Sequence, residues 1–107
     1  MPYIVLEAWY PTDIMDEVVD TYFEVLKQMP FDRSLGKETI QVAVSSDKKG
    51  IKTMSISEVK EGKLEEALTW VDKRLVPLQR IKGFECKARI WSTVIEALEN
   101  IGRSLPG

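Results

Sequence analysis

Charged side chains alternate with small or apolar ones along the stretch FECKARIW, residues 84–91. Glu85, Lys87, Arg89 and Trp91 occupy every second position, so a β-strand here would place all four on one face. Cationic and carboxylate groups held side by side can bind a polar ligand or transfer a proton, and an indole ring adds a flat apolar surface. This strand face is therefore the first candidate for a binding site.

The same alternation occurs near the N-terminus, in YIVLEAW, residues 3–9. If this segment and residues 84–91 form neighbouring antiparallel strands, Glu7 lies within reach of Lys87 or Arg89 across the ladder. The predicted ligand-binding set then comprises Tyr3, Glu7, Trp9, Lys87, Arg89 and Trp91.

Structural roles explain the same side chains equally well. Glu7 with Lys87 or Arg89 can be a cross-strand ion pair that lets a half-buried face tolerate charge. Trp9 and Trp91 can be anchors of a protein–protein interface, where Trp is enriched. A binding site and a structural contact therefore both stay open at this point.

Histidine is absent from the 107 residues, which removes the commonest general base and the commonest metal ligand. The sequence contains no glycine-rich phosphate loop, no paired CxxC and no nucleophile elbow. It therefore predicts neither a metal site nor a cofactor, and it leaves any catalytic residue unknown.

Charge and cysteine content narrow the expected partners and compartment. The 15 basic residues are dispersed among 17 acidic ones, for a net charge of −2, so nucleic acid is not an expected partner. No apolar run approaches the roughly 20 residues that span a bilayer, so no membrane partner is expected. The single Cys86 cannot form an internal disulfide and the N-terminus lacks the basic region of a secretory signal, which together indicate the cytoplasm.

Hydrophobic periodicity divides the chain into alternating strands and helices. Segments of period two predict strands, whereas apolar residues at steps of three and four predict helices. The expected strands are residues 2–10, 39–46, 51–59 and 84–91. One helix is expected between residue 12 and Pro30, and one from residue 64 with a kink or an end near Val76 because of Pro77; a short one follows at residues 95–105.

The resulting order, βαββαβ with a C-terminal helix, is that of a ferredoxin-like α+β domain, here a single domain over residues 1–107. Right-handed crossovers place both long helices on one face of a four-stranded antiparallel sheet, with the first and third strands in its centre. The helix-covered face is expected to take Ile4, Leu6, Ala8, Ile40, Val42, Val44, Met54, Ile56, Phe84, Cys86, Ala88 and Ile90. The open face is expected to take Tyr3, Val5, Glu7, Trp9, Gln41, Ala43, Ser45, Thr53, Ser55, Ser57, Glu85, Lys87, Arg89 and Trp91.

An open face that mixes two Trp and a Tyr with charges resembles that of the dimeric α/β-barrel family, in which two ferredoxin-like subunits pack sheet against sheet. The resemblance rests on element order and face pattern. It implies a homodimer with polar and aromatic residues lining the space between the sheets. Members of the family include cofactor-free monooxygenases, haem-degrading enzymes and ligand-binding proteins; haem binding generally needs a histidine, which this chain lacks.

Two classes of function follow from this. The first is a small dimeric domain that binds a small, partly apolar ligand or acts in assembly through its open sheet face. The alternative is a cofactor-free oxygenase or isomerase. A closed pocket would favour ligand binding or catalysis over assembly, and a carboxylate or Tyr without a charge partner in that pocket would favour the enzyme.

Overall fold

The computed structural model describes residues 1–106 and contains the predicted alternation of strands and helices. The elements are β1 (Tyr3–Tyr10), the short 3-10 turn η1 (Thr12–Ile14), α1 (Met15–Gln28), β2 (Gly36–Asp47), β3 (Gly50–Val59), α2 (Leu64–Gln79), β4 (Glu85–Trp91) and α3 (Val94–Glu99). The predicted α+β class and the order βαββαβ with a C-terminal helix are therefore confirmed.

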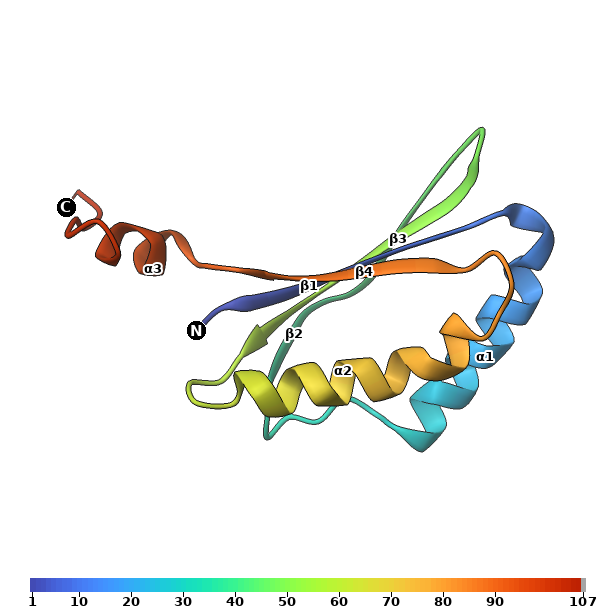
Figure 1. Cartoon of the computed structure of the whole chain (residues 1–107), viewed down its shortest axis with the longest axis horizontal. Coiled ribbons are helices and arrows are strands. Elements are labelled where there is room, and N and C mark those ends of the chain that lie inside the picture. The colour runs from blue at the N-terminus through green and yellow to red at the C-terminus, as the bar shows by residue number, and fades with distance from the viewer. Residues whose placement is uncertain (107) are drawn as a thin grey trace.

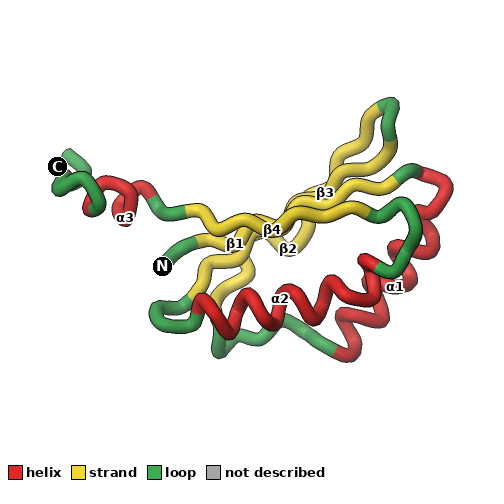
Figure 2. The backbone as a smooth tube through the Cα atoms, viewed as in Figure 1, coloured by secondary structure: helices red, strands yellow, loops and turns green. Residues whose placement is uncertain are grey.

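The four strands form one antiparallel sheet in the spatial order β2-β3-β1-β4, which is the predicted one. Both long helices lie on the same side of this sheet, and the opposite side carries no helix (Figures 1 and 2). This arrangement is consistent with a ferredoxin-like fold. No helix within residues 1–106 is long and apolar enough to cross a membrane.

The hydrophobic core lies between the sheet and the two helices. Ile4, Ala8 and Tyr10 of β1 are buried there, because alternate residues of this central strand all point toward the helices. The helices contribute the apolar stripes that their periodicity predicts; the buried members are Val18, Val25, Ala67, Val71, Leu75 and Leu78.

The faces of β3 are the reverse of the prediction. Ser57 pairs with the buried Ile4 and Thr53 with the buried Ala8, so the hydroxyl side chains of β3 face the helices. Met54 and Ile56, expected under the helices, lie on the open face instead. The strand is fixed in this phase by its two ends, since Ile51 and Val59 share the parity of Ser55 and are both buried.

Two irregularities in β2 change its faces as well. The register between β2 and β3 shifts between Glu38 and Ile40 and again between Ile40 and Ala43. Such bulges insert residues into one strand only and re-aim the side chains around them. Ile40 consequently pairs with Ile56, which shares the open face by its register with β1, contrary to the prediction. Gln41, expected on the open face, is among the residues that line the cavity under the helices.

The last two helices also differ from expectation. Of the two effects expected of Pro77, an end of the helix near Val76 is wrong, because α2 continues to Gln79. Helix α3 begins at a capping box in which Thr93 accepts from the backbone N–H of Glu96 at 3.1 Å and Glu96 accepts from that of Thr93 at 2.8 Å. This helix projects from the end of β4 and lies apart from the helix–sheet layer (Figure 1).

Candidate functional site

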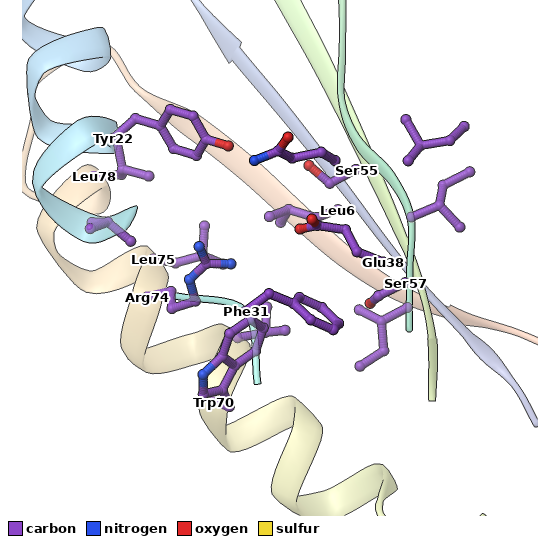
Figure 3. Close-up of a pocket in the computed structure, with 16 residues that line it drawn as sticks. Leu6, Tyr22, Phe31, Glu38, Ser55, Ser57, Trp70, Arg74, Leu75 and Leu78 are labelled. Atoms are coloured by element: carbon purple, nitrogen blue, oxygen red, sulfur yellow. The ribbon is translucent and has the colours of Figure 1, made fainter. Parts of the chain in front are cut away.

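A cavity of about 80 Å³ lies inside the helix–sheet layer. The strands β1, β2 and β3 form one wall, and α1 and α2 form the other (Figure 3). Its apolar lining comes from residues such as Leu6, Leu75 and Leu78, as expected for the core of a two-layer domain. Several polar side chains interrupt this lining, and their arrangement makes the cavity the candidate site.

The polar groups enter the cavity from opposite walls. Arg74 on α2 directs its guanidinium toward the strands, and the carboxylate of Glu38 on β2 points back toward the helices (Figure 3). Ser55 and Ser57 add two hydroxyl groups from β3, and Tyr22 adds its phenol from α1. The reversed phase of β3 and the first bulge of β2 therefore have a common result: they gather polar side chains under the helices.

Arg74 is the most constrained of these groups. Its guanidinium carbon lies 4.5 Å from the centre of the Trp70 ring, a cation–π contact that holds the side chain in place. Trp70 is itself held edge-to-face by Phe31, with 5.3 Å between ring centres. Burial lowers the pKa of Arg74, and the negative charge of Glu38 acts in the opposite direction.

The Nε atom of Arg74 is buried and has no hydrogen-bond partner within residues 1–106. A guanidinium is a fork of five N–H donors, and a buried donor without an acceptor carries its full desolvation cost. An acceptor atom of a bound molecule would remove this cost. Arg74 therefore brings a donor without a partner to the helix wall of a largely apolar cavity.

Tyr22 faces the same space from α1. Burial raises the pKa of its phenol above the ordinary value, and the positive charge of Arg74 partly offsets that rise. The phenol is therefore protonated at neutral pH and can donate as well as accept a hydrogen bond. Together, Tyr22 and Arg74 offer donors to one polar group, and Glu38 offers an acceptor.

A second hollow of about 300 Å³ adjoins the cavity. The two spaces share Leu6, Tyr22, Ser55, Leu75 and Leu78 as lining. The outer hollow is walled mostly by apolar side chains of α1, β1, β2 and α2, and its lining includes Phe84 and Tyr10. Ligand pockets commonly measure about 300–1,000 Å³, so the inner cavity and outer hollow together reach the size of a small-molecule site.

The six residues predicted from the sequence lie elsewhere. Tyr3 pairs with Trp91 and Glu7 with Lys87, so all of them share the open face, as expected. The lining of the inner cavity and of the outer hollow contains none of the six. Trp91 is 51% exposed, and Lys87 and Arg89 are exposed as well.

The ion pair of Glu7 differs from the prediction. Its carboxylate lies 3.3 Å from Nζ of Lys52 on β3, and within residues 1–106 no ion pair links it to Lys87 or Arg89. Lys52 also lies 5.5 Å from the centre of the Trp9 ring. Glu7, Lys52 and Trp9 thus form a compact cluster on the open face, while Lys87 stays opposite Glu7 in the ladder without forming the expected bridge.

Sequence reasoning missed Arg74, Glu38 and Tyr22. Glu38 directly precedes the predicted strand 39–46, and Tyr22 and Arg74 fall within the two predicted long helices, where no motif marks them as cavity residues. A usable signal was present in β3, because Ile51 and Val59 bracket a run in which Thr53, Ser55 and Ser57 alternate. Buried ends with hydroxyls between them indicate a strand whose covered face borders a polar cavity.

Comparisons with known proteins give the fold and nothing about the site. No protein-family model matches the chain, and no curated protein matches it. A solved structure entitled "De novo designed protein Foldit4" is similar with a TM-score of 0.56 and 11% sequence identity. The similarity covers 87% of this chain and 99% of the designed one. It supports the overall arrangement of strands and helices alone.

Proposed function

We propose that this protein binds a small amphipathic molecule between its sheet and its helices, with a polar head in the inner cavity and an apolar body in the outer hollow. The unpartnered, buried Nε of Arg74 is the observation that carries the proposal. A buried polar group without a partner is rare in folded proteins and calls for a specific explanation. An acceptor supplied by a ligand provides one.

The chemistry of the lining defines the ligand class. The head needs an acceptor for Arg74 and Tyr22 and a donor for Glu38, which a phenol, an enol or a similar hydroxyl group provides. The body must be apolar, because Val18, Phe84 and their neighbours wall the outer hollow. Flat, ring-containing molecules with one polar end fit both requirements.

The test compares two probes that differ only in the head group, 1-naphthol and naphthalene. Titration calorimetry should show that the wild type binds 1-naphthol more tightly than naphthalene. Arg74→Met keeps the length of the side chain but removes its donors, so 1-naphthol should bind at least tenfold more weakly, as expected for a lost hydrogen bond to a charged group worth about 1.5–3 kcal/mol. Naphthalene affinity should change less than twofold.

Lys73→Met is the matched control, because Lys73 is the exposed cation next to Arg74 on the same helix. It should leave the affinity for both probes unchanged. Equal losses of both probes in Arg74→Met would show that the variant damages the cavity rather than a donor. Absence of any 1-naphthol binding to a folded wild type, together with no co-purified molecule by native mass spectrometry, would contradict the proposal.

A second candidate function, catalysis of proton transfer, is favoured by Glu38. Its carboxylate points into the cavity (Figure 3), and within the described residues it forms no ion pair. Such a carboxylate can take a proton from a carbon next to a carbonyl group while Arg74 and Tyr22 donate to the resulting enolate oxygen. Return of the proton to another carbon completes an isomerisation without a cofactor.

Hydrogen–deuterium exchange of 2-tetralone in D2O, followed by NMR, tests this second function. The wild type should accelerate exchange at the carbons beside the carbonyl, and Glu38→Gln should lower the rate about a hundredfold. Glu58→Gln, on the open face of β3, should leave the rate unchanged. A wild type that binds 2-tetralone without accelerating exchange would leave ligand binding as the function.

We also infer that two copies associate through their open sheet faces, as in the dimeric α/β-barrel family. The support is the composition of that face. With Met54, Ile56 and Ile40 added to Tyr3 and Trp9, it is more apolar than the sequence alone predicts. Sheets stacked face to face bury side chains of this kind in a shared layer.

A further inference from the structure

Two opposite charges face each other inside the molecule without touching. Glu38 on β2 and Arg74 on α2 enter the inner cavity from opposite walls (Figure 3). Within residues 1–106, no ion pair joins them. Burial dominates the pKa values of Arg74 and Tyr22, and the charge of Glu38 acts on both in the upward direction, which agrees with the position of all three around one space. A pair of charges held apart leaves each of them able to interact with a ligand.

The backbone, rather than an ion pair, sets the direction of Glu38. This residue pairs with Ser57 in the β2–β3 ladder, and Ser57 pairs in turn with Ile4, which is buried under the helices. Residues that pair across a ladder share a face of the sheet, so the register directs Glu38 to the helix side. The ladder therefore holds the carboxylate at the cavity, where it acts on whatever enters.

The inner cavity has room for a head group but not for a ring. Its volume is about 80 Å³, whereas a cavity that accommodates benzene measures about 150 Å³. A ring-containing ligand therefore has to keep its ring in the outer hollow of about 300 Å³ and insert only its polar end. That polar end then lies among Glu38, Arg74 and Tyr22.

The two charged residues favour opposite kinds of head group. Arg74 alone would favour a carboxylate, whose two oxygens match the N–H fork of a guanidinium. Glu38 adds a negative charge, and the described lining of the two spaces contains no third charged residue. A carboxylate head beside Glu38 would therefore face like-charge repulsion in a largely apolar site. A neutral group that both accepts and donates hydrogen bonds avoids this repulsion and satisfies both residues.

We propose that Glu38 determines the ligand specificity of this site: it excludes carboxylates and other anionic head groups, and it selects neutral heads that accept from Arg74 and donate to Glu38 itself. Hydroxyl and carboxamide groups meet this description. The proposal rests on ligand binding in the inner cavity, as proposed above, and adds the charge state of the head that is accepted. Specificity then comes from a repulsive contact as well as from attractive ones.

Two probes of the same shape, 1-naphthamide and 1-naphthoate, separate charge from size. At pH 7 the first is neutral and the second is an anion, and both carry a planar head on the same ring system. In titration calorimetry the wild type should bind 1-naphthamide at least tenfold more tightly than 1-naphthoate, because the anion comes to lie beside Glu38. A head group rejected for its size would be rejected in both forms.

Glu38→Gln keeps the size and planarity of the side chain and removes its charge. This variant should bind 1-naphthoate at least tenfold more tightly than the wild type does, since Arg74 can then pair with the anion. Its affinity for 1-naphthamide should change less than fivefold, because the amide that replaces the carboxylate still offers a carbonyl oxygen as an acceptor. The double change Glu38→Gln/Arg74→Met should lose the gained affinity for 1-naphthoate.

Glu58→Gln is the matched control, because Glu58 lies on the open face of β3 and outside the lining of both spaces. It should keep the preference of the wild type. A wild type that binds both probes equally, or a Glu38→Gln variant that gains no affinity for 1-naphthoate, would overturn the role of Glu38 while binding of 1-naphthamide and 1-naphthol still stands. Failure of the wild type and of Glu38→Gln to bind any of these probes, with both folded by circular dichroism, would instead contradict ligand binding itself and the specificity with it.

Discussion

The carboxylate of Glu7 lies between cations on both neighbouring strands and pairs with Lys52 of β3 rather than with Lys87 of β4. Lys52 gains a second contact from the Trp9 ring, which Lys87 lacks in the structure. Half-exposed ion pairs contribute little, so Glu7→Gln and Lys52→Gln should each cost about 0.5 kcal/mol in urea unfolding. Lys87→Gln should cost nothing measurable. A larger loss in Lys87→Gln than in Lys52→Gln would contradict this pairing.

Tyr22 should make stability fall at high pH. Burial raises the pKa of its phenol in the folded state above the ordinary value of 10.0. The stabilisation is complete below pH 10, where the phenol is neutral in both states, and it is lost as pH rises through the folded-state pKa. Urea unfolding at pH 9, 10 and 11 should therefore show a steeper decline for the wild type than for Tyr22→Phe.

Tyr10 also contributes to the fall in stability at high pH, so removing one phenol removes only part of that fall. Burial raises the pKa of its phenol too, so Tyr22→Phe should keep part of the decline and Tyr10→Phe another part. An identical pH profile in Tyr22→Phe and the wild type would show that the phenol is not held in a desolvated environment.

At the scale of elements, the turn at Gly50 joins β2 and β3 under a strict geometric condition. Its φ is +136°, and an added Cβ would clash with the carbonyl oxygen of Tyr10. Gly50→Ala should therefore cost about 3 kcal/mol, through both backbone strain and a clash. Gly62 has φ of +78° with open space around it, so Gly62→Ala should cost about 1 kcal/mol. Equal losses of stability in Gly50→Ala and Gly62→Ala, measured by thermal unfolding, would show that the clash with Tyr10 contributes nothing.

Element order and strand order follow from the sequence, because period two and period 3.6 are distinct along most of this chain. The face that each strand presents to the helices is harder to derive. In β3, Met54 and Ile56 look like core residues, but the buried Ile51 and Val59 set the opposite phase. In β2 the two bulges change, within one strand, which residues face the helices. No residue pattern in the sequence predicts these bulges.

The candidate site was missed for the same reason. With Ser55 and Ser57 placed on the open face, the predicted lining of the space under the helices is purely apolar, and nothing distinguishes Arg74 from a surface residue of α2. The six side chains predicted on β1 and β4 do lie on the open face, because these two strands are regular and pair residue for residue. Which cation Glu7 selects depends on side-chain packing, which a register does not determine.

For the whole molecule, association of two chains links stability to concentration. Association through the open sheet faces, as proposed above, stabilises the folded chains, so mass action raises the melting temperature as protein concentration rises. A hundredfold increase should raise Tm by about 5 °C for two chains of this size. The Tm of Ile56→Lys, which places a charge on the open face of β3, should not depend on concentration. A wild-type Tm that is constant from 1 to 100 μM would show that each chain is stable alone.

The C-terminal segment, residues 90–106, also marks the limit of prediction at this scale. The spacing of Ile95, Leu98 and Ile101 indicates a helix with an apolar side. It does not tell which surface meets that side. That information depends on where β4 ends relative to the sheet, and hence on the assembled fold.

The position of β1 in the sheet has a consequence for biosynthesis. Of the four strands, β1 is made before the others although it is a central one, and its two neighbours, β3 and β4, are made later. The hairpin of β2 and β3 can close early because its partners are adjacent in sequence, but Tyr3 must wait for Trp91. Until then, the β4 side of YIVLEAWY is an unpaired edge rich in β-forming residues. A chain stalled or truncated before residue 85 should therefore be prone to aggregation even though most of its core is already made.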